Sequence, residues 1–159
     1  MSMFVKALDA STPKSEQSKQ IAVLYAVILV VMAVAQLFTF DTFMELVASF
    51  HFPLPETAQF LIAPLLIVCE IFALPFLLRM RLSPAFRVLS MGCSWLVPVK
   101  WFLLTLWVVN SGQPVESIGF LGSIGELTPG WWAVLLSVSL GIMAAWSSWG
   151  LWPFRTANK

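Results

Sequence analysis

The sequence predicts an all-α integral membrane protein, a bundle of four helices. Of the residues, 59% are hydrophobic and only 11% charged, whereas soluble domains carry about 25% charged residues. Four apolar runs, at about 21–40, 58–78, 88–109 and 131–152, each match the length that crosses a hydrocarbon core of about 30 Å at 1.5 Å per residue. Inside lipid such runs must be helical, because a lone strand leaves its backbone polar groups unpaired.

Residues 1–20 form a polar tail rich in Ser, Thr, Gln and Lys, and we expect it to be mobile and cytoplasmic. The first span follows. Within it, residues 33–35 (Ala-Val-Ala) resemble a signal-peptidase site. The polar leader is long for a signal peptide, and the apolar run continues to Phe40, so we expect this span to be retained.

The first connecting loop predicts a short amphipathic helix. Asp41 is a candidate N-cap, and Phe43, Val47 and Phe50 recur at helical spacing. We expect this helix to lie at the membrane interface. The proline-bearing residues 51–55 then turn the chain into the second span.

The segment 110–130 is punctuated by glycines and is long for a connection in a compact bundle, a property often associated with function. We expect it to pack over the outer mouth of the bundle. Thr128 and Pro129 predict the start of the last span, as cap and first-turn proline. That span carries Ser137, Gly141 and Ala145 at four-residue spacing, a helix-packing stripe of small residues.

The distribution of charge predicts the orientation. Eight of the nine Lys and Arg residues fall in 1–20, 79–87 and 155–159, which lie on one side of a four-span topology. The loops on the other side contain acidic residues and no Lys or Arg. The positive-inside rule places the basic side, and therefore both termini, including the tail 153–159, in the cytoplasm. In a prokaryotic cell this is the inner membrane.

Glu70 and Lys100 are the charged residues within the apolar runs. We estimate their depths as roughly 18 Å and 14 Å from the outer end of their spans. Side chains lean toward the N-terminus of their helix, so in antiparallel spans these two lean toward each other. An isolated charge at the bilayer centre costs at least about 2.5–3.5 kcal/mol. We therefore expect an intramembrane polar pair, which serves either helix register alone or a binding or proton-transfer site.

Three further residues suggest a polar pocket around this pair. Gln36 lies in the outer part of the first span, Cys69 precedes Glu70, and Pro98 leaves the carbonyl of Ser94 without its helical donor. Proline-broken helices near buried charges are typical of bundles that line cavities.

Several chemistries are excluded by the residues present. His51 is the single histidine, so neither two haem ligands nor an all-His metal site can come from this chain. Cys69 and Cys93 lie in apolar runs, and their spacing indicates neither a zinc site nor a disulfide framework. No nucleotide-binding or hydrolase motif occurs, and no basic tract for nucleic acid. We predict no catalytic residues, no metal and no resident cofactor.

Residues 40–78 read FDTFMELVASFHFPLPETAQFLIAPLLIVCEIFALPFLL. An amphipathic segment, a proline turn and a helix with a mid-span acid resemble the DoxX-like family, which includes the methylamine-utilisation protein MauE. Glu70 matches the family's mid-helix acid, and Gly119-Phe-Leu-Gly resembles a degenerate form of the MauE loop Cys-x-Cys-Phe-Gly. The loop cysteines are missing here, so thiol exchange is not expected. The resemblance implies a four-helix membrane accessory protein of a respiratory or redox-enzyme system.

Three functions therefore stay open. The first is the accessory role, with a membrane protein partner or a second copy of the chain bound within the lipid bilayer. The second is a small oligomeric carrier or proton-coupled permease that uses Glu70 and Lys100. The third is quinone binding in an aromatic pocket formed by Trp95, Trp101 and Trp107.

Overall fold

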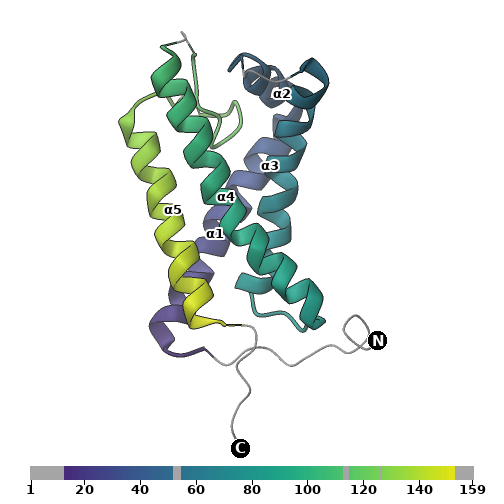
Figure 1. The fold of residues 1–159 in the computed structure, drawn as a ribbon, viewed down its shortest axis with the longest axis vertical. Helices are drawn as coiled ribbons and strands as arrows, with labels where there is room; N and C mark the ends of the chain where they lie inside the picture. The colour runs from purple at the N-terminus through teal and green to yellow at the C-terminus, as the bar shows by residue number, and fades with distance from the viewer. Residues whose placement is uncertain (1–12, 52–54, 113–114, 126, 153–159) are drawn as a thin grey trace, which may run out of the picture.

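A computed structural model describes residues 13–51, 55–112, 115–125 and 127–152, except for the side chains of 56–59. The regular elements in these ranges are all α-helices, which confirms the all-α prediction (Figure 1). They are α1 (Glu16–Phe38), α2 (Phe40–Ala48), α3 (Glu56–Leu77), α4 (Pro84–Ser111) and α5 (Trp131–Gly150). The predicted tails, with Lys6, Arg155 and Lys159, lie outside the described residues except for positions 13–20.

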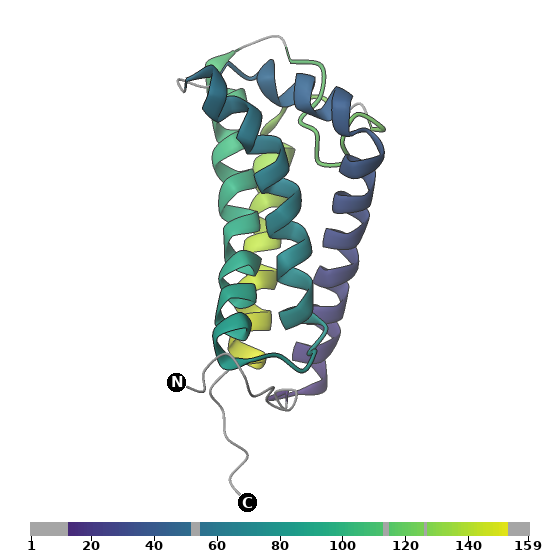
Figure 2. The same cartoon turned by 90° about the vertical axis from the view of Figure 1, so that its right-hand side faces the viewer.

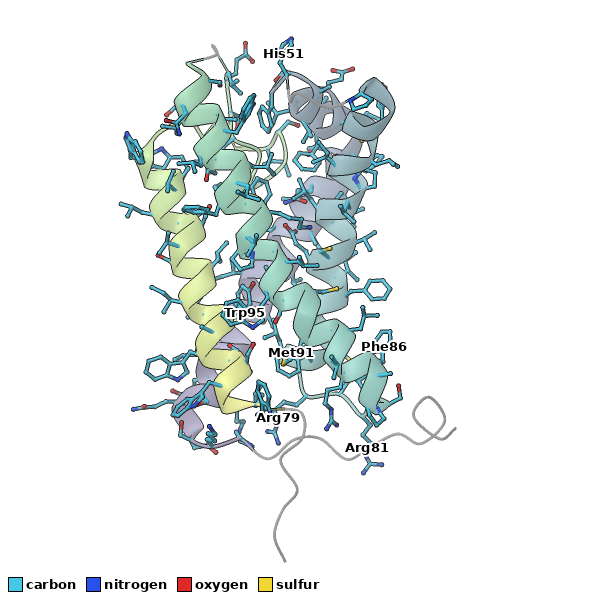
Figure 3. All side chains as sticks on the ribbon, viewed as in Figure 1. His51, Arg79, Arg81, Phe86, Met91 and Trp95 are labelled. Atoms are coloured by element: carbon cyan, nitrogen blue, oxygen red, sulfur yellow. The ribbon has the colours of Figure 1, made fainter. Side chains whose placement is uncertain are left out.

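The four long helices are long and apolar enough to cross a membrane, as predicted. They run alternately up and down, and α2 lies across one end of the bundle (Figures 1 and 2). Each long helix packs against two others: α1 and α4 both contact α3 and α5. We call the two ends the α2 end and the opposite end. His51 lies at the α2 end, whereas Arg79 and Arg81 lie at the opposite end (Figure 3).

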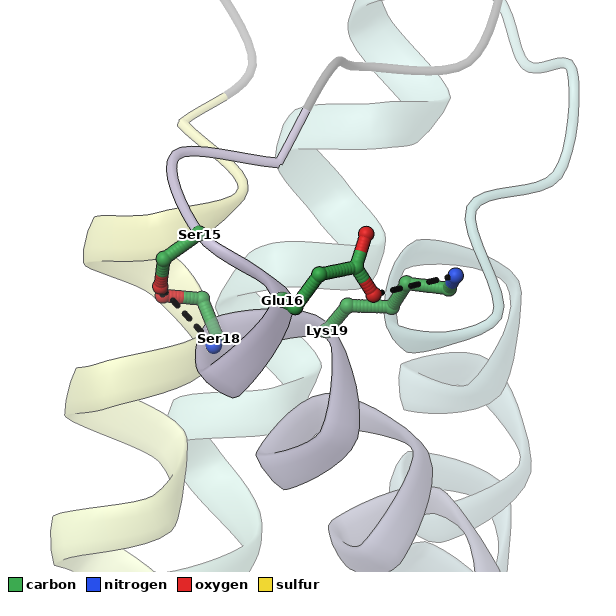
Figure 4. Close-up of polar contacts among 4 residues, drawn as sticks. All are labelled: Ser15, Glu16, Ser18 and Lys19. Carbon is green, nitrogen blue, oxygen red and sulfur yellow. Dashed lines mark hydrogen bonds and ion pairs between the residues drawn. The ribbon is translucent and has the colours of Figure 1, made fainter.

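Helix α1 begins at Glu16, within the polar segment that we expected to be a mobile tail. The cause is a local cap: the hydroxyl of Ser15 accepts a hydrogen bond from the backbone N–H of Ser18 at 3.2 Å. Lys19 also donates to Glu16 at 3.4 Å on the same turn (Figure 4). Polar residues can begin a membrane helix when their side chains satisfy its free N–H groups.

The predicted short helix is present as α2, but its N-cap is Thr39 and not Asp41. The helix starts earlier because α1 ends at Phe38 and Thr39 alone separates the two helices. The expected apolar stripe of Phe43, Val47 and Phe50 is buried. This stripe therefore belongs to the protein core, where α2 packs against α3.

A break in the helical hydrogen bonding of α3 is repaired by a side chain of the neighbouring helix α4. Near Pro75, the hydroxyl of Ser90 accepts from the Phe76 N–H at 2.9 Å and donates to the Phe72 carbonyl at 2.6 Å. One side chain of α4 thus bridges a gap in the ladder of α3. Such repair allows prolines to stand inside membrane helices.

Helix α5 begins at Trp131 with Gly130 as its N-cap, so the prediction that Thr128 and Pro129 start it was wrong by two residues. The Thr128 carbonyl instead accepts a hydrogen bond from the Trp132 indole at 3.0 Å. At the other end of α5, a Cβ added to Gly150 would collide with the Ser18 side chain. The missing side chain at Gly150 is therefore what allows α1 and α5 to approach closely there.

Candidate functional site

Glu70 lies at the centre of a buried polar cluster. Its side chain is fully buried, as are those of Gln36 on α1 and Trp101 on α4. The Trp101 indole N–H donates to Oε1 of Glu70 at 2.9 Å, and Nε2 of Gln36 donates to the same oxygen at 3.4 Å. Three of the four long helices therefore meet at one carboxyl group.

The backbone of the segment 117–125, which we call the capping segment, completes this cluster. Nε2 of Gln36 donates to the Phe120 carbonyl at 3.2 Å. The Phe120 ring stacks on Trp101 with centroids 4.4 Å apart and is only 2% exposed. The capping segment thus closes the α2 end of the bundle directly above Glu70.

Two acceptor atoms in the cluster, Oε2 of Glu70 and Oε1 of Gln36, are buried and have no hydrogen-bond partner within the described part of the chain. Buried polar atoms in proteins are nearly always paired with protein or ordered water. Among the described residues, the cluster therefore has fewer donors than acceptors.

The prediction that Lys100 pairs directly with Glu70 was wrong. Within the described ranges no ion pair joins the two side chains; Nζ of Lys100 donates instead to the carbonyls of Leu65, at 3.0 Å, and Leu66, at 3.5 Å. Successive residues on a helix point about 100° apart, so when Trp101 faces the bundle axis Lys100 cannot. Lys100 consequently lies half-buried against α3 and binds its backbone.

The other members of the predicted polar pocket do not all reach Glu70. The Ser94 carbonyl, which Pro98 deprives of its helical donor, accepts a hydrogen bond from the buried Tyr25 hydroxyl at 2.8 Å. The Ser94 hydroxyl donates to Met91 within its own helix. Cys69 is a buried free thiol. Of the three predicted pocket residues, Gln36 is the one with a hydrogen bond to Glu70.

Close contacts and hydrogen bonds hold the capping segment on the bundle. Ser123 shares a hydrogen bond of 2.6 Å with the Thr42 hydroxyl, and its N–H donates to the Thr39 hydroxyl at 3.1 Å. Gly119 and Gly122 both have positive φ angles. A Cβ on Gly122 would collide with the Thr39 hydroxyl and lie 3.0 Å from the Ala35 carbonyl. Glycine at this position therefore lets the capping segment touch α1.

Outside the capping segment lies a hollow of about 500 Å³ between α2 and the 115–123 stretch. Its polar lining includes the carboxylates Glu45 and Glu116 and the hydroxyls of Thr42, Ser49, Ser117 and Ser123. Leu46 and Val115 supply apolar wall. The hollow is thus acidic and opens beside the segment that covers Glu70.

A second depression, of about 380 Å³, is an apolar groove between α4 and α5. The predicted small-residue stripe of Ser137, Gly141 and Ala145 lines its α5 side, together with Val138 and Ile142. The α4 side is Trp95, Pro98, Val99, Phe102 and Leu103. The Ser137 hydroxyl donates to the Ala133 carbonyl of its own helix, so it does not make the groove polar.

The three tryptophans proposed for quinone binding do not form one pocket. Trp95 borders the apolar groove (Figure 3). Trp101 is buried beside Glu70, and the Trp107 indole donates to the Phe50 carbonyl at 3.0 Å near the α2 end. Residues six positions apart on a helix point in different directions, so these rings separate around α4.

No group of three His, Cys, Asp or Glu side chains is placed to hold a metal ion in the part of the chain that the structure describes. Comparisons with protein-family models, with curated proteins and with solved structures found no match. The polar cluster, the hollow and the groove are the features from which a function can be inferred.

Sequence reasoning missed two hydrogen bonds of the cluster, the one from the Trp101 indole to Glu70 and the one from Gln36 to the Phe120 carbonyl. We predicted Trp101 only as part of an aromatic pocket, although a buried indole needs an acceptor for its N–H. That requirement was the available signal for pairing it with the single buried carboxylate. No sequence signal placed the Phe120 carbonyl, because it depends on the loop conformation.

Proposed function

We propose that this chain is an integral membrane accessory protein that assists a respiratory or redox-enzyme system by contact within the bilayer. The observation that supports this role best is the apolar groove between α4 and α5, which lies on two helices long enough to cross a membrane. The redox assignment comes from the resemblance to the DoxX-like family, through the mid-helix acid Glu70.

The occupant that we propose for the groove is a transmembrane helix of the partner. Its small residues on α5, Gly141 and Ala145, allow a neighbouring backbone to approach closely, and helix association in lipid depends on such packing. Trp95, Phe102 and Ile142 offer larger apolar walls for the partner's side chains. A Cβ on Gly141 would contact only Pro98 at 3.8 Å, so the contacts within the chain do not require a glycine there.

The proposed orientation places the opposite end of the bundle in the cytoplasm of a prokaryotic inner membrane, with α2 at the outer interface. Arg79 and Arg81 lie at that opposite end (Figure 3), whereas the acidic hollow with Glu45 and Glu116 lies at the α2 end. This separation of charge follows the positive-inside rule. Labelling of single cysteines introduced at Arg81 and at Ser123 with a membrane-impermeant thiol reagent tests it, and labelling of the Arg81 position from outside would contradict it.

The experiment for the accessory role is gentle solubilisation from the native membrane, followed by mass spectrometry of the proteins that co-purify. The decisive variant is Gly141→Leu, which fills the groove. A matched control is Val31→Leu, an enlargement on α1 at a side chain that is 52% exposed and outside the groove. We expect a stoichiometric redox-enzyme partner that is lost with Gly141→Leu and kept with Val31→Leu. If both variants retain it, or if the wild-type chain is a homo-oligomer alone, the accessory role is wrong.

One observation favours a second candidate, a proton-coupled carrier. Glu70 is a carboxyl group buried in the bundle with an unpartnered oxygen, and intramembrane acids of this kind often mark proton and ion pathways. Lys100, which donates to the α3 backbone nearby, would then interact electrostatically with Glu70 without a direct hydrogen bond. Uptake into proteoliposomes that disappears in Glu70→Gln supports the carrier, and uptake that persists contradicts it.

A further inference from the structure

The polar cluster around Glu70 is short of hydrogen-bond donors. The single N–H of the Trp101 indole is used on Glu70, and the two N–H groups of Gln36 are used on Glu70 and on the Phe120 carbonyl. The nearby Tyr25 hydroxyl is already donated to Ser94. Two acceptors, Oε2 of Glu70 and Oε1 of Gln36, have no donor among the residues that the structure describes, although both side chains are fully buried.

We propose that Glu70 and Gln36 form a binding site for one small hydrogen-bond donor, a water molecule or a proton, and that the capping segment is the lid through which it enters. A proton on Oε2 would turn that acceptor into a donor. A water molecule would offer one hydrogen to each acceptor. A proton and a water molecule each supply the hydrogen-bond donor that the cluster lacks. Neither occupant depends on the proposed contact between the groove and a partner helix.

The position of the cluster along the bundle indicates the end from which its occupant enters. Gln36 lies in the last turn of α1, at the α2 end, and the Phe120 carbonyl touches it from above. Residues of the capping segment also line the acidic hollow, where Glu45 and Glu116 would attract cations and protons. The capping segment therefore contributes both to the wall of that hollow, through Ser117 and Ser123, and to the polar cluster, through the Phe120 carbonyl.

The lid is held on the bundle by noncovalent contacts, and its residues Ile118 and Phe120 are buried. Ser123 of the lid forms hydrogen bonds with Thr39 and Thr42. Thr39 separates α1 from α2, and Thr42 lies in α2. The Phe120 ring stacks on Trp101 without a covalent or ionic tie. Opening the lid therefore means separating Phe120 from Trp101 while the four long helices stay packed on one another.

Ionisable groups on α1 and α4 influence the charge of Glu70. Tyr25 on α1 and Lys100 on α4 interact with it electrostatically. Helix α5 carries no ionisable side chain. The acids of the hollow, Glu45 and Glu116, stand beyond the lid. Protonation of Glu70 therefore depends chiefly on its own cluster and on Lys100.

The experiment that tests the lid holds the capping segment closed with a disulfide. In Thr42→Cys/Ser123→Cys, the two positions whose hydroxyl oxygens are 2.6 Å apart can be joined by a disulfide. The readout is deuterium exchange of the Trp101 indole N–H, followed by NMR in the full chain in nanodiscs and assigned by the loss of its signal in Trp101→Phe. The Trp107 indole is the internal control, because it donates to Phe50 outside the lid.

We expect oxidation to slow exchange at Trp101 by at least about tenfold, and reduction to restore it, with Trp107 unchanged. Single Ser123→Cys treated with the same oxidant should show no slowing. Gly122→Ala, whose added Cβ collides with Thr39, should lift the lid and speed exchange at Trp101. Equal exchange in the oxidised and reduced double variant overturns the lid.

The occupant is distinguished by infrared spectroscopy and by magnetisation transfer from water. A neutral carboxyl band that vanishes in Glu70→Gln identifies the proton. Absence of that band, with transfer from a bound water to the Trp101 indole, identifies the water molecule. An ionised Glu70 with no bound water beside Trp101 overturns the donor site, whatever the groove variants show about a partner.

Discussion

The Trp101 indole should stabilise the fold far more than another indole of the same helix. In Trp101→Phe the ring that stacks on Phe120 is largely kept, but the donor to Glu70 is lost. The hydrogen bond is 2.9 Å long and both side chains are fully buried. Leaving a buried acceptor without its donor costs about 1–3 kcal/mol, and the smaller ring leaves a void, so we expect a loss of about 2–4 kcal/mol.

The matched control is Trp107→Phe. Its indole also donates to an oxygen, the Phe50 carbonyl at 3.0 Å, but the side chain is 38% exposed and the acceptor is neutral. A neutral, partly exposed hydrogen bond contributes about 0.5–1.5 kcal/mol. Both variants lose one indole N–H from α4, so the difference between them isolates the contribution of the buried carboxyl group.

The assay is reversible unfolding in mixed micelles with increasing denaturing detergent, followed by circular dichroism, because each variant loses a fluorescent tryptophan. We expect Trp101→Phe to unfold at a clearly lower detergent fraction than Trp107→Phe. Equal free energies of unfolding, within about 0.5 kcal/mol, would refute the reasoning that Trp101 is the principal donor to Glu70.

The same unfolding assay checks three further predictions. Tyr25→Phe should cost about 1–3 kcal/mol because the Ser94 carbonyl, which has no helical donor, loses the hydroxyl that donates to it; an unchanged stability would mean that water replaces the hydroxyl. Ser90→Ala should cost about 1–3 kcal/mol by reopening the break beside Pro75, and Ser90→Thr should recover part of that loss. Gly150→Ala should cost about 1–3 kcal/mol, since its added methyl group collides with α1, whereas Gly141→Ala should be nearly neutral.

The number and type of helices could be predicted because lipid leaves the backbone few choices. Each apolar run long enough to cross the bilayer must satisfy its own N–H and C=O groups, and the helix is the single-segment solution. Local signals also worked for the presence of α2, where Phe43 and Val47 recur on one buried face. The predicted helix caps were less accurate. Helix α2 starts before Asp41 and α5 starts after Pro129, because the connection to the preceding element decides where each helix can begin.

The partners of Glu70 were only half predictable. Its burial followed from its place within an apolar run, and Gln36 was recognised as a nearby polar group. The sequence positions of Lys100 and Trp101 could not show which of the two side chains contacts Glu70, since the residues are adjacent in the chain and lie at nearly the same depth. The rotation of α4 about its axis decides between them, and it turns Trp101 inward.

The sequence by itself determined that this chain forms helices suited to a membrane, with a single acid deep among them. Only the tertiary structure decided which face of each helix is inside. In α1, Tyr25 and Leu29 are fully buried while Val27 and Val31 are 53% and 52% exposed, yet all four are largely apolar. In water the exposed face of a helix would be polar and would reveal the rotation. In lipid both faces are apolar, so the rotation is set by packing and by the buried hydrogen bonds of Glu70, Ser90 and Tyr25.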